Sequence, residues 1–253
     1  YHGDIGYGQK TKDPIEYERV FATEHNIDAH GALNRSANAE DRAAAKRIRE
    51  YLEKRYDSAS RMYDGGFDTR EERPLDAQTW MTLTMSEADR IKNLSLLNAA
   101  TKEAIRKYEL TADFKGKKIT GVSSGNGDVR GVWPEGTYGL ILSLRALASA
   151  NQKAKNLPQA KAFRDKANFY ETEMAKLQSS DGSVIYDTSG VWNNGKPFSH
   201  MSGTAWGILV RDGVNPFNPD EKLESGPANL FTSQTNCSSQ SVAPRAVEEV
   251  TGE

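Results

Sequence analysis

Four stretches dense in acidic residues, His, Trp and Gly each open an apolar, helix-like run in this chain of 253 residues. They lie at residues 23–28, 75–80, 132–137 and 199–206. The longer runs between them carry one apolar stripe and a charged face, which is typical of helices with one side in water. The alternation of unusual helix starts with ordinary amphipathic helices indicates a ring of helical hairpins. The starts of the inner helices would then meet at one mouth of that ring.

The spacing of the apolar residues predicts an all-α fold with seven helices. Four of them carry the unusual starts and are expected at residues 15–34, 76–86, 134–150 and 201–211. The amphipathic helices are expected at residues 40–56, 88–108 and 158–177. A long functional loop that could include a short hairpin is expected at residues 115–130, and a short strand at 184–186. We expect residues 1–218 to form one domain and residues 219–253 to form a polar tail.

Composition and motifs argue against several classes of partner and of functional site. The net charge of −2 gives no reason to expect a nucleic-acid partner, because nucleic-acid-binding proteins carry a basic patch. No run of about 18 apolar residues is present, so no membrane span is expected. The lone Cys237 can form neither an internal disulfide nor a metal site. Neither a phosphate-binding loop nor a Gly-x-Ser-x-Gly elbow occurs. We expect no metal and no cofactor.

The motifs at the helix starts resemble those of the (α/α) toroid carbohydrate-active enzymes, which are glycoside hydrolases and polysaccharide lyases built from rings of helical hairpins. The resemblance is to secreted bacterial proteins and covers about residues 20–217. It is carried by Thr-Glu-His-Asn-Ile-Asp at 23–28, Asp-x-Gln-x-Trp at 76–80, Trp-x-Glu-Gly-Thr at 133–137, Thr-Ala-Trp at 204–206 and Asn-Pro-Phe at 215–217.

The resemblance implies an (α/α) toroid that acts on a polysaccharide or oligosaccharide substrate in a secreted or periplasmic protein. A complete toroid of this kind has more helices than the seven predicted here. We therefore expect an incomplete toroid, or one that a second chain or a missing N-terminal segment completes.

A glycoside hydrolase is the first functional hypothesis. Hydrolysis needs two carboxyl groups beside the bond, one to protonate the leaving oxygen and one to activate water or attack the sugar. Glu135 is the sharpest candidate, because its neighbours Trp133 and Gly136 form an apolar setting that would raise a carboxyl pKa. A first-turn acid favoured by the helix dipole is its structural alternative. The candidate partners of Glu135 are Glu24, Asp28 and Asp76.

Two of these partners have their own signals. Glu24 and Asp28 are four residues apart and therefore share one face of a helix. Their structural alternative is bonding to the next helix start. Asp76 stands where an N-cap belongs, so a capping role competes with a catalytic one.

A polysaccharide lyase is the second hypothesis. A lyase neutralises the carboxylate of a uronic acid, abstracts the C5 proton and protonates the leaving oxygen. His25 and Tyr138 are the catalytic candidates for this reaction, and Asn26, His200 and Arg130 are candidates for substrate binding. A buried, hydrogen-bonded imidazole is the structural alternative for His25. The third hypothesis is a non-catalytic glycan-binding protein.

The tryptophans are candidates for stacking on sugar rings. Trp133 and Trp192 stand in loops or first turns, where a sugar-binding platform is favoured. Trp80 and Trp206 lie one turn into their helices, where core packing is favoured instead. Trp80 is nevertheless kept as a binding candidate.

Overall fold

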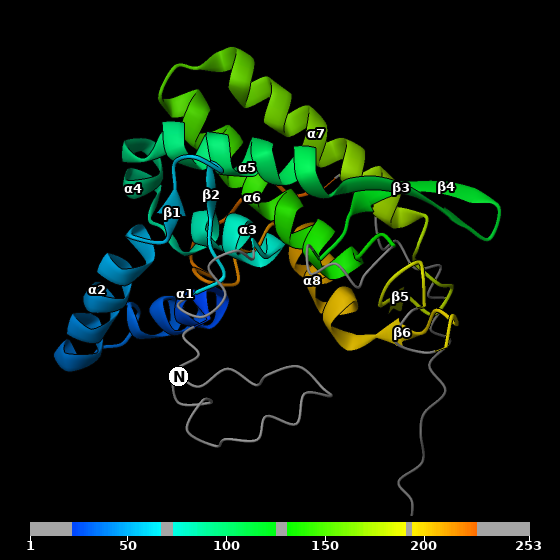
Figure 1. The fold of residues 1–253 in the computed structure, drawn as a ribbon, viewed down its shortest axis with the longest axis horizontal. Coiled ribbons are helices and arrows are strands. Elements are labelled where there is room, and N and C mark those ends of the chain that lie inside the picture. The colour runs from blue at the N-terminus through cyan, green and yellow to red at the C-terminus, as the bar shows by residue number, and fades with distance from the viewer. Residues whose placement is uncertain (1–21, 67–72, 125–130, 191–193, 227–253) are drawn as a thin grey trace, which may run out of the picture.

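The computed structural model describes residues 22–66, 73–124, 131–190 and 194–226. Within these ranges the chain forms eight helices and six short strands (Figure 1). The helices are α1 Thr23–Leu33, α2 Ala39–Glu53, α3 Leu75–Thr84, α4 Glu87–Lys92, α5 Leu94–Tyr108, α6 Pro134–Lys153, α7 Leu157–Ala175 and α8 Met201–Asp212. The strands are β1 Tyr56–Asp57, β2 Met62–Tyr63, β3 Glu109–Phe114, β4 Lys117–Val122, β5 Val184–Ile185 and β6 Ser199–His200.

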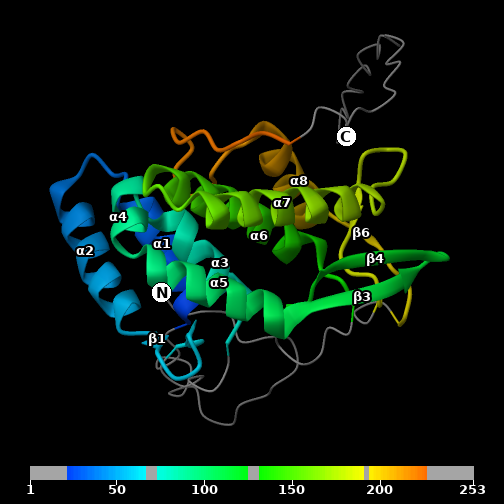
Figure 2. The same ribbon diagram turned by 90° about the horizontal axis from the view of Figure 1, so that it is seen from above.

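The prediction of an all-α fold is wrong. The residues that the structure describes are 57% helical but also 13% strand, and their strands pair as three two-stranded antiparallel sheets. The largest is the β3–β4 hairpin, which projects beyond the helices from the end of α5 (Figures 1 and 2). Its two-residue turn places Lys115 and Gly116 at φ of 52° and 76°, the left-handed backbone that suits the right-handed twist of a hairpin. The Lys- and Gly-rich composition that suggested a loop therefore belongs to this turn.

A second difference concerns the helix expected at residues 88–108. Its first part is the separate helix α4, and the break falls at Asn93, which has φ −101° and ψ 16°. The Asn93 side chain donates to the carbonyl of Asp89 at 3.0 Å. An Asn that bonds its own backbone offers an alternative to continued helix, which is the physical reason for the break.

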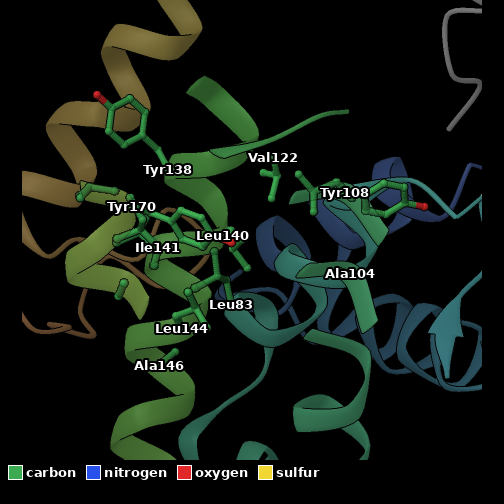
Figure 3. Packing of buried hydrophobic residues seen from close by; sticks show 14 of the residues in the cluster. Leu83, Ala104, Tyr108, Val122, Tyr138, Leu140, Ile141, Leu144, Ala146 and Tyr170 are labelled. Carbon is green, nitrogen blue, oxygen red and sulfur yellow. The ribbon is translucent and has the colours of Figure 1, made fainter. Parts of the chain in front are cut away.

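Helix α6 is the centre of the molecule. It packs against α3, α4, α5, α7, α8 and β4, and α5 and α7 flank it in Figure 2. Leu140, Ile141 and Leu144 of α6 are fully buried, and they lie with Leu83 of α3 and Tyr170 of α7 in Figure 3. Its buried residues lie on every side of the helix, so α6 is stable only when its neighbours cover it all round.

Helices α1, α3, α6 and α8 lie in a row, since α1 packs on α3, α3 on α6 and α6 on α8. The N-terminal ends of the four helices lie on the same side of this row. Ser202, in the first turn of α8, hydrogen-bonds Glu135 in the first turn of α6. Glu135, together with Glu24 of α1, also exerts its charge on Asp76 of α3. The four unusual helix starts therefore lie together.

Backbone bonds from distant segments hold three of these starts. Thr23 donates its N–H to the carbonyl of Gly65 at 2.9 Å, Leu75 to Ser124 at 3.3 Å and Trp133 to Val122 at 2.8 Å. Helix α8 follows β6 directly, and β6 pairs with β5. These bonds satisfy N–H groups that a helix start would otherwise leave without partners, and they fix the position of each first turn.

The chain after α8 turns back across the molecule. Gly213 ends α8 with a left-handed φ of 62°. Asn215 donates to the carbonyl of Leu83 and to Glu221 Oε2, both at 2.8 Å. Glu221 also pairs with the buried Arg90 of α4. Residues 219–226, the part of the expected tail that the structure describes, thus begin as a segment held against α4.

Candidate functional site

Four carboxylates gather at the N-terminal ends of α1, α3 and α6, and we call them the acidic site: Glu24, Asp28, Asp76 and Glu135. Sequence reasoning singled out the same four as candidates. Burial raises the pKa of Asp76 well above its ordinary value of 3.8, and the charges of the other three carboxylates raise it further. Because α1 packs on α3 and α3 on α6, the structure brings the four carboxylates to neighbouring helix ends.

Asp76 is the most constrained member of the acidic site. Its Oδ1 is sealed from solvent and has no hydrogen-bond partner among the residues that the structure describes. Pro74, not Asp76, occupies the N-cap of α3, so the capping role considered for Asp76 is not the one that it has here. A desolvated carboxyl beside like charges favours its protonated form. Asp76 is therefore suited to donate a proton.

Glu135 is held from α8. Its Oε2 accepts a hydrogen bond from Ser202 Oγ at 2.6 Å. Ser202 Oγ also lies 2.6 Å from Nδ1 of His200, and His200 Nδ1 caps α8 by accepting from the Ser202 N–H at 3.3 Å. Glu135 stands in the first turn of α6, where the positive end of the helix dipole favours a negative charge. His200, a predicted binding residue, is thus linked to Glu135 through one hydroxyl group.

Two aromatic rings pack on His200. Tyr186 and Phe198 stack with ring centroids 5.6 Å apart, and Tyr186 meets the imidazole edge-on at 5.1 Å. Burial, then the charge of Glu135, raises the pKa of Tyr186 above its ordinary value. Sequence reasoning missed Tyr186 because its position depends on the bond from its N–H to the carbonyl of Phe198 at 2.8 Å. A signal was present, since the strand expected at 184–186 places Tyr186 beside a turn.

The α1 side of the acidic site holds a histidine. His25 Nε2 lies 3.7 Å from Glu24 Oε1, and His25 Nδ1 is buried with no partner in the described ranges. Asp28 reaches solvent on its outer side. Desolvation of the remainder raises its pKa to about 6, with the charge of His25 opposing this effect and that of Glu24 adding to it. Asn26 donates to the carbonyl of Ala22 at 2.9 Å, so it serves the helix start.

One turn further along α3 and α8, two tryptophan side chains lie next to the acidic site. Trp80 follows Asp76 by four residues and Trp206 follows Ser202 by four, so each lies on the same helix face as the polar residue before it. The two indoles stack with centroids 5.7 Å apart and planes 10° apart. Phe217 packs on Trp80 at 5.7 Å. These half-buried rings form an aromatic layer beneath the acidic site.

Two further candidates lie in the core. Trp133 is 8% exposed and packs on Gly136, so the platform role predicted from its loop position is not supported. Tyr138 is 2% exposed, and its pKa is raised by burial and then by the charge of Glu171 rather than by the acidic site. Arg130 and Trp192, both predicted to bind substrate, lie outside the described residues.

Neither a metal-binding cluster nor a membrane-spanning helix occurs among the described residues. No group of three or more His, Cys, Asp or Glu side chains in the described part of the chain is placed to hold a metal ion. The described helices also include none that is long and apolar enough to cross a membrane.

No protein-family model, curated protein or solved structure matches this chain. The resemblance to toroid carbohydrate-active enzymes therefore stays a prediction.

Substitution of two glycines of α6 tests how tightly this helix is packed near the acidic site. A Cβ on Gly136 would lie 2.3 Å from the Trp133 ring, whereas one on Gly139 would lie 3.3 Å from Trp80 Nε1. We expect Gly136→Ala to lower the free energy of unfolding by about 1–3 kcal/mol through overpacking. Gly139→Ala should stay within about 1 kcal/mol of wild type, since helical Ala offsets the closer contact. Urea denaturation of both variants checks this, and equal midpoints would contradict it.

Proposed function

We propose that this chain is a glycoside hydrolase that cleaves a neutral polysaccharide or oligosaccharide, with Asp76 as the general acid and Glu135 as the general base or nucleophile. The observation that carries the proposal is the position of Asp76, a carboxyl desolvated at Oδ1 and set among three other carboxylates. Such a group keeps its proton at a pH where its neighbours are ionised, which is how hydrolases separate acid from base.

The remaining members of the acidic site support the same reaction. Cleavage of a glycosidic bond passes through a transition state with positive charge on the sugar ring. The carboxylates of Glu24 and Asp28, which act electrostatically on Asp76, would stabilise that charge. The Ser202 hydroxyl and the N-terminus of α6 support the negative charge that Glu135 needs as a base.

The aromatic layer suits a sugar substrate. Trp80 and Trp206 present half-buried indoles one turn below the carboxylates. The C–H groups of a sugar ring can pack against the exposed part of such rings, while carboxylates beside them accept bonds from hydroxyl groups. The layer therefore offers an apolar surface beside the proposed acid and base.

Two observations weigh against the lyase alternative. A uronic-acid polymer carries a negative charge on each sugar, and four clustered carboxylates would repel it. The tyrosine predicted as a lyase residue, Tyr138, is buried in the core. Neutral sugars avoid the repulsion, and hydrolysis needs no tyrosine.

The test is a paired assay of the chain on a panel of neutral and uronic-acid polysaccharides. New reducing ends and new ultraviolet absorbance are followed together. We expect reducing ends without absorbance on a neutral polymer. Absorbance from an unsaturated product on an acidic polymer would replace the proposal with a lyase. Glycan binding by calorimetry without turnover on any polymer would indicate a binding protein.

A further inference from the structure

Glu135, Ser202 and His200 form a continuous hydrogen-bonded chain. Ser202 Oγ is 2.6 Å from Glu135 Oε2 and 2.6 Å from His200 Nδ1. A serine hydroxyl has one proton, so it donates to one of these neighbours and accepts from the other. Capping of α8 explains only the 3.3 Å bond from the Ser202 N–H to Nδ1. Capping does not explain the two 2.6 Å contacts of Ser202 Oγ.

The chain has two complete arrangements that differ by one proton. When Glu135 is ionised, Ser202 donates to Oε2 and His200 donates from Nδ1 to Ser202 Oγ. When Glu135 carries a proton, Glu135 donates to Ser202 Oγ and Ser202 donates to an unprotonated Nδ1. Both short contacts are hydrogen bonds in both arrangements. The capping bond from the Ser202 N–H to Nδ1 is made only in the second, in which Nδ1 is unprotonated.

We propose that Ser202 and His200 are a proton relay that carries a proton between Glu135 and the edge of the acidic site. In turnover, a role that rests on the proposed function, Glu135 would take a proton from water while neutral His200 carries its own proton at Nε2, which gives the second arrangement. The O–H bond of Glu135 then breaks as one forms at Ser202 Oγ, and the original Ser202 O–H bond breaks as an N–H bond forms at Nδ1. The products are a Glu135 carboxylate and an imidazolium, which loses its Nε2 proton to solvent and leaves the first arrangement. Exchange of the remaining imidazole proton from Nδ1 to Nε2 through solvent readies the relay for the next turnover. Ser202 and His200 are positioning residues in this scheme, since they act through Glu135.

Aromatic rings and acidic groups surround the relay. The Tyr186 and Phe198 rings meet His200 edge-on at 5.1 Å and 6.1 Å and fix its plane. The titratable groups that face Glu135 and the rings packed on His200 are Asp76 of α3 and Tyr186 and Asp187 after β5. Burial raises the pKa of Tyr186, so this group stays neutral at ordinary pH.

The experiment follows the titration of the His200 ring nitrogens by 15N NMR in the intact chain, without substrate, with His200→Gln to assign the signals. Glu135→Gln should move the His200 titration midpoint down by at least about half a pH unit, because a negative partner is removed. In a Ser202→Ala background, the same change should move it by less than half as much. Ser202→Gly replaces Ser202→Ala if the latter does not fold.

The conservative variant separates the relay from a structural role. Ser202→Thr keeps the hydroxyl and should restore the full coupling between Glu135 and His200. Coupling that is absent, or equal with and without a hydroxyl at position 202, overturns the relay. Since no substrate is used, this result is independent of whether any polymer is cut. Hydrolysis without coupling would keep the proposed function and reject the relay.

Discussion

Asp76→Asn is expected to lower kcat on a cleaved neutral polymer by about 10²–10⁴-fold, the range that general acid catalysis contributes. Asn has nearly the shape of Asp but cannot donate a proton to the leaving oxygen. Reducing-end kinetics on the purified variant give the measurement, and Asp165→Asn on the exposed face of α7 is the matched control. Activity above about a tenth of wild type would show that another group is the acid.

The same substitution should stabilise the fold, which separates loss of chemistry from loss of structure. The folded-state pKa of Asp76 is raised above its ordinary value of 3.8. Between those two values the folded chain binds more protons than the unfolded chain, so the Asp76 contribution to stability falls as pH rises through that window. Asp76→Asn removes this pH-dependent loss of folding stability. We expect a higher melting temperature at about pH 7 and little change below about pH 4.

Arg145→Met is expected to cost about 3–5 kcal/mol of unfolding free energy at about pH 8, because it leaves a buried carboxylate without its partner. Arg145 and Glu171 are 2% and 1% exposed and form an ion pair between α6 and α7. Arg145 also donates to the carbonyl of Val210 on α8 at 2.8 Å. One guanidinium thus joins three helices. Lys161→Met, at an exposed pair on α7, should cost less than about 1 kcal/mol.

The pH dependence of this cost identifies its cause. Burial raises the pKa of Glu171 above its ordinary 4.5 even beside Arg145, and loss of the guanidinium would raise it further. The folded variant then holds a proton over a wider pH range than the unfolded chain, so its stability falls as pH rises through that range. Guanidinium denaturation should show a smaller cost at about pH 5. If Glu171→Leu fails to restore stability in the Arg145→Met background, the cost lies in lost packing instead.

The acidic site was largely predictable because its carboxylates occupy local motifs. Glu24 and Asp28 are four residues apart, and Asp76 and Glu135 each stand in a first turn. Position in a first turn follows from sequence spacing, and α3 and α6 begin within two residues of where they were expected. The partners of these carboxylates were less predictable. Ser202 reaches Glu135 across 67 residues, and no local signal specifies that contact.

Two elements show where local reasoning stops. The turn at Lys115 and Gly116 looked like part of a loop, because most of β3 and the first two residues of β4 meet solvent, which weakens the apolar alternation of a hairpin. Tyr138 stands three residues after Glu135 in a motif that suggested catalysis, yet it is buried. Whether a side chain faces the site or the core depends on which neighbours surround α6.

The sequence by itself determined the helix periodicity, the polar first turns and the identity of the four carboxylates, since these depend on residues close together in the chain. Tertiary structure decided that the four N-termini lie at one end, that Asp76 Oδ1 is desolvated, and that Tyr186, Ser202 and His200 join the site. The reason is physical: a pKa or a hydrogen bond depends on distances and burial set by packing between segments far apart in the chain, which no local spacing specifies.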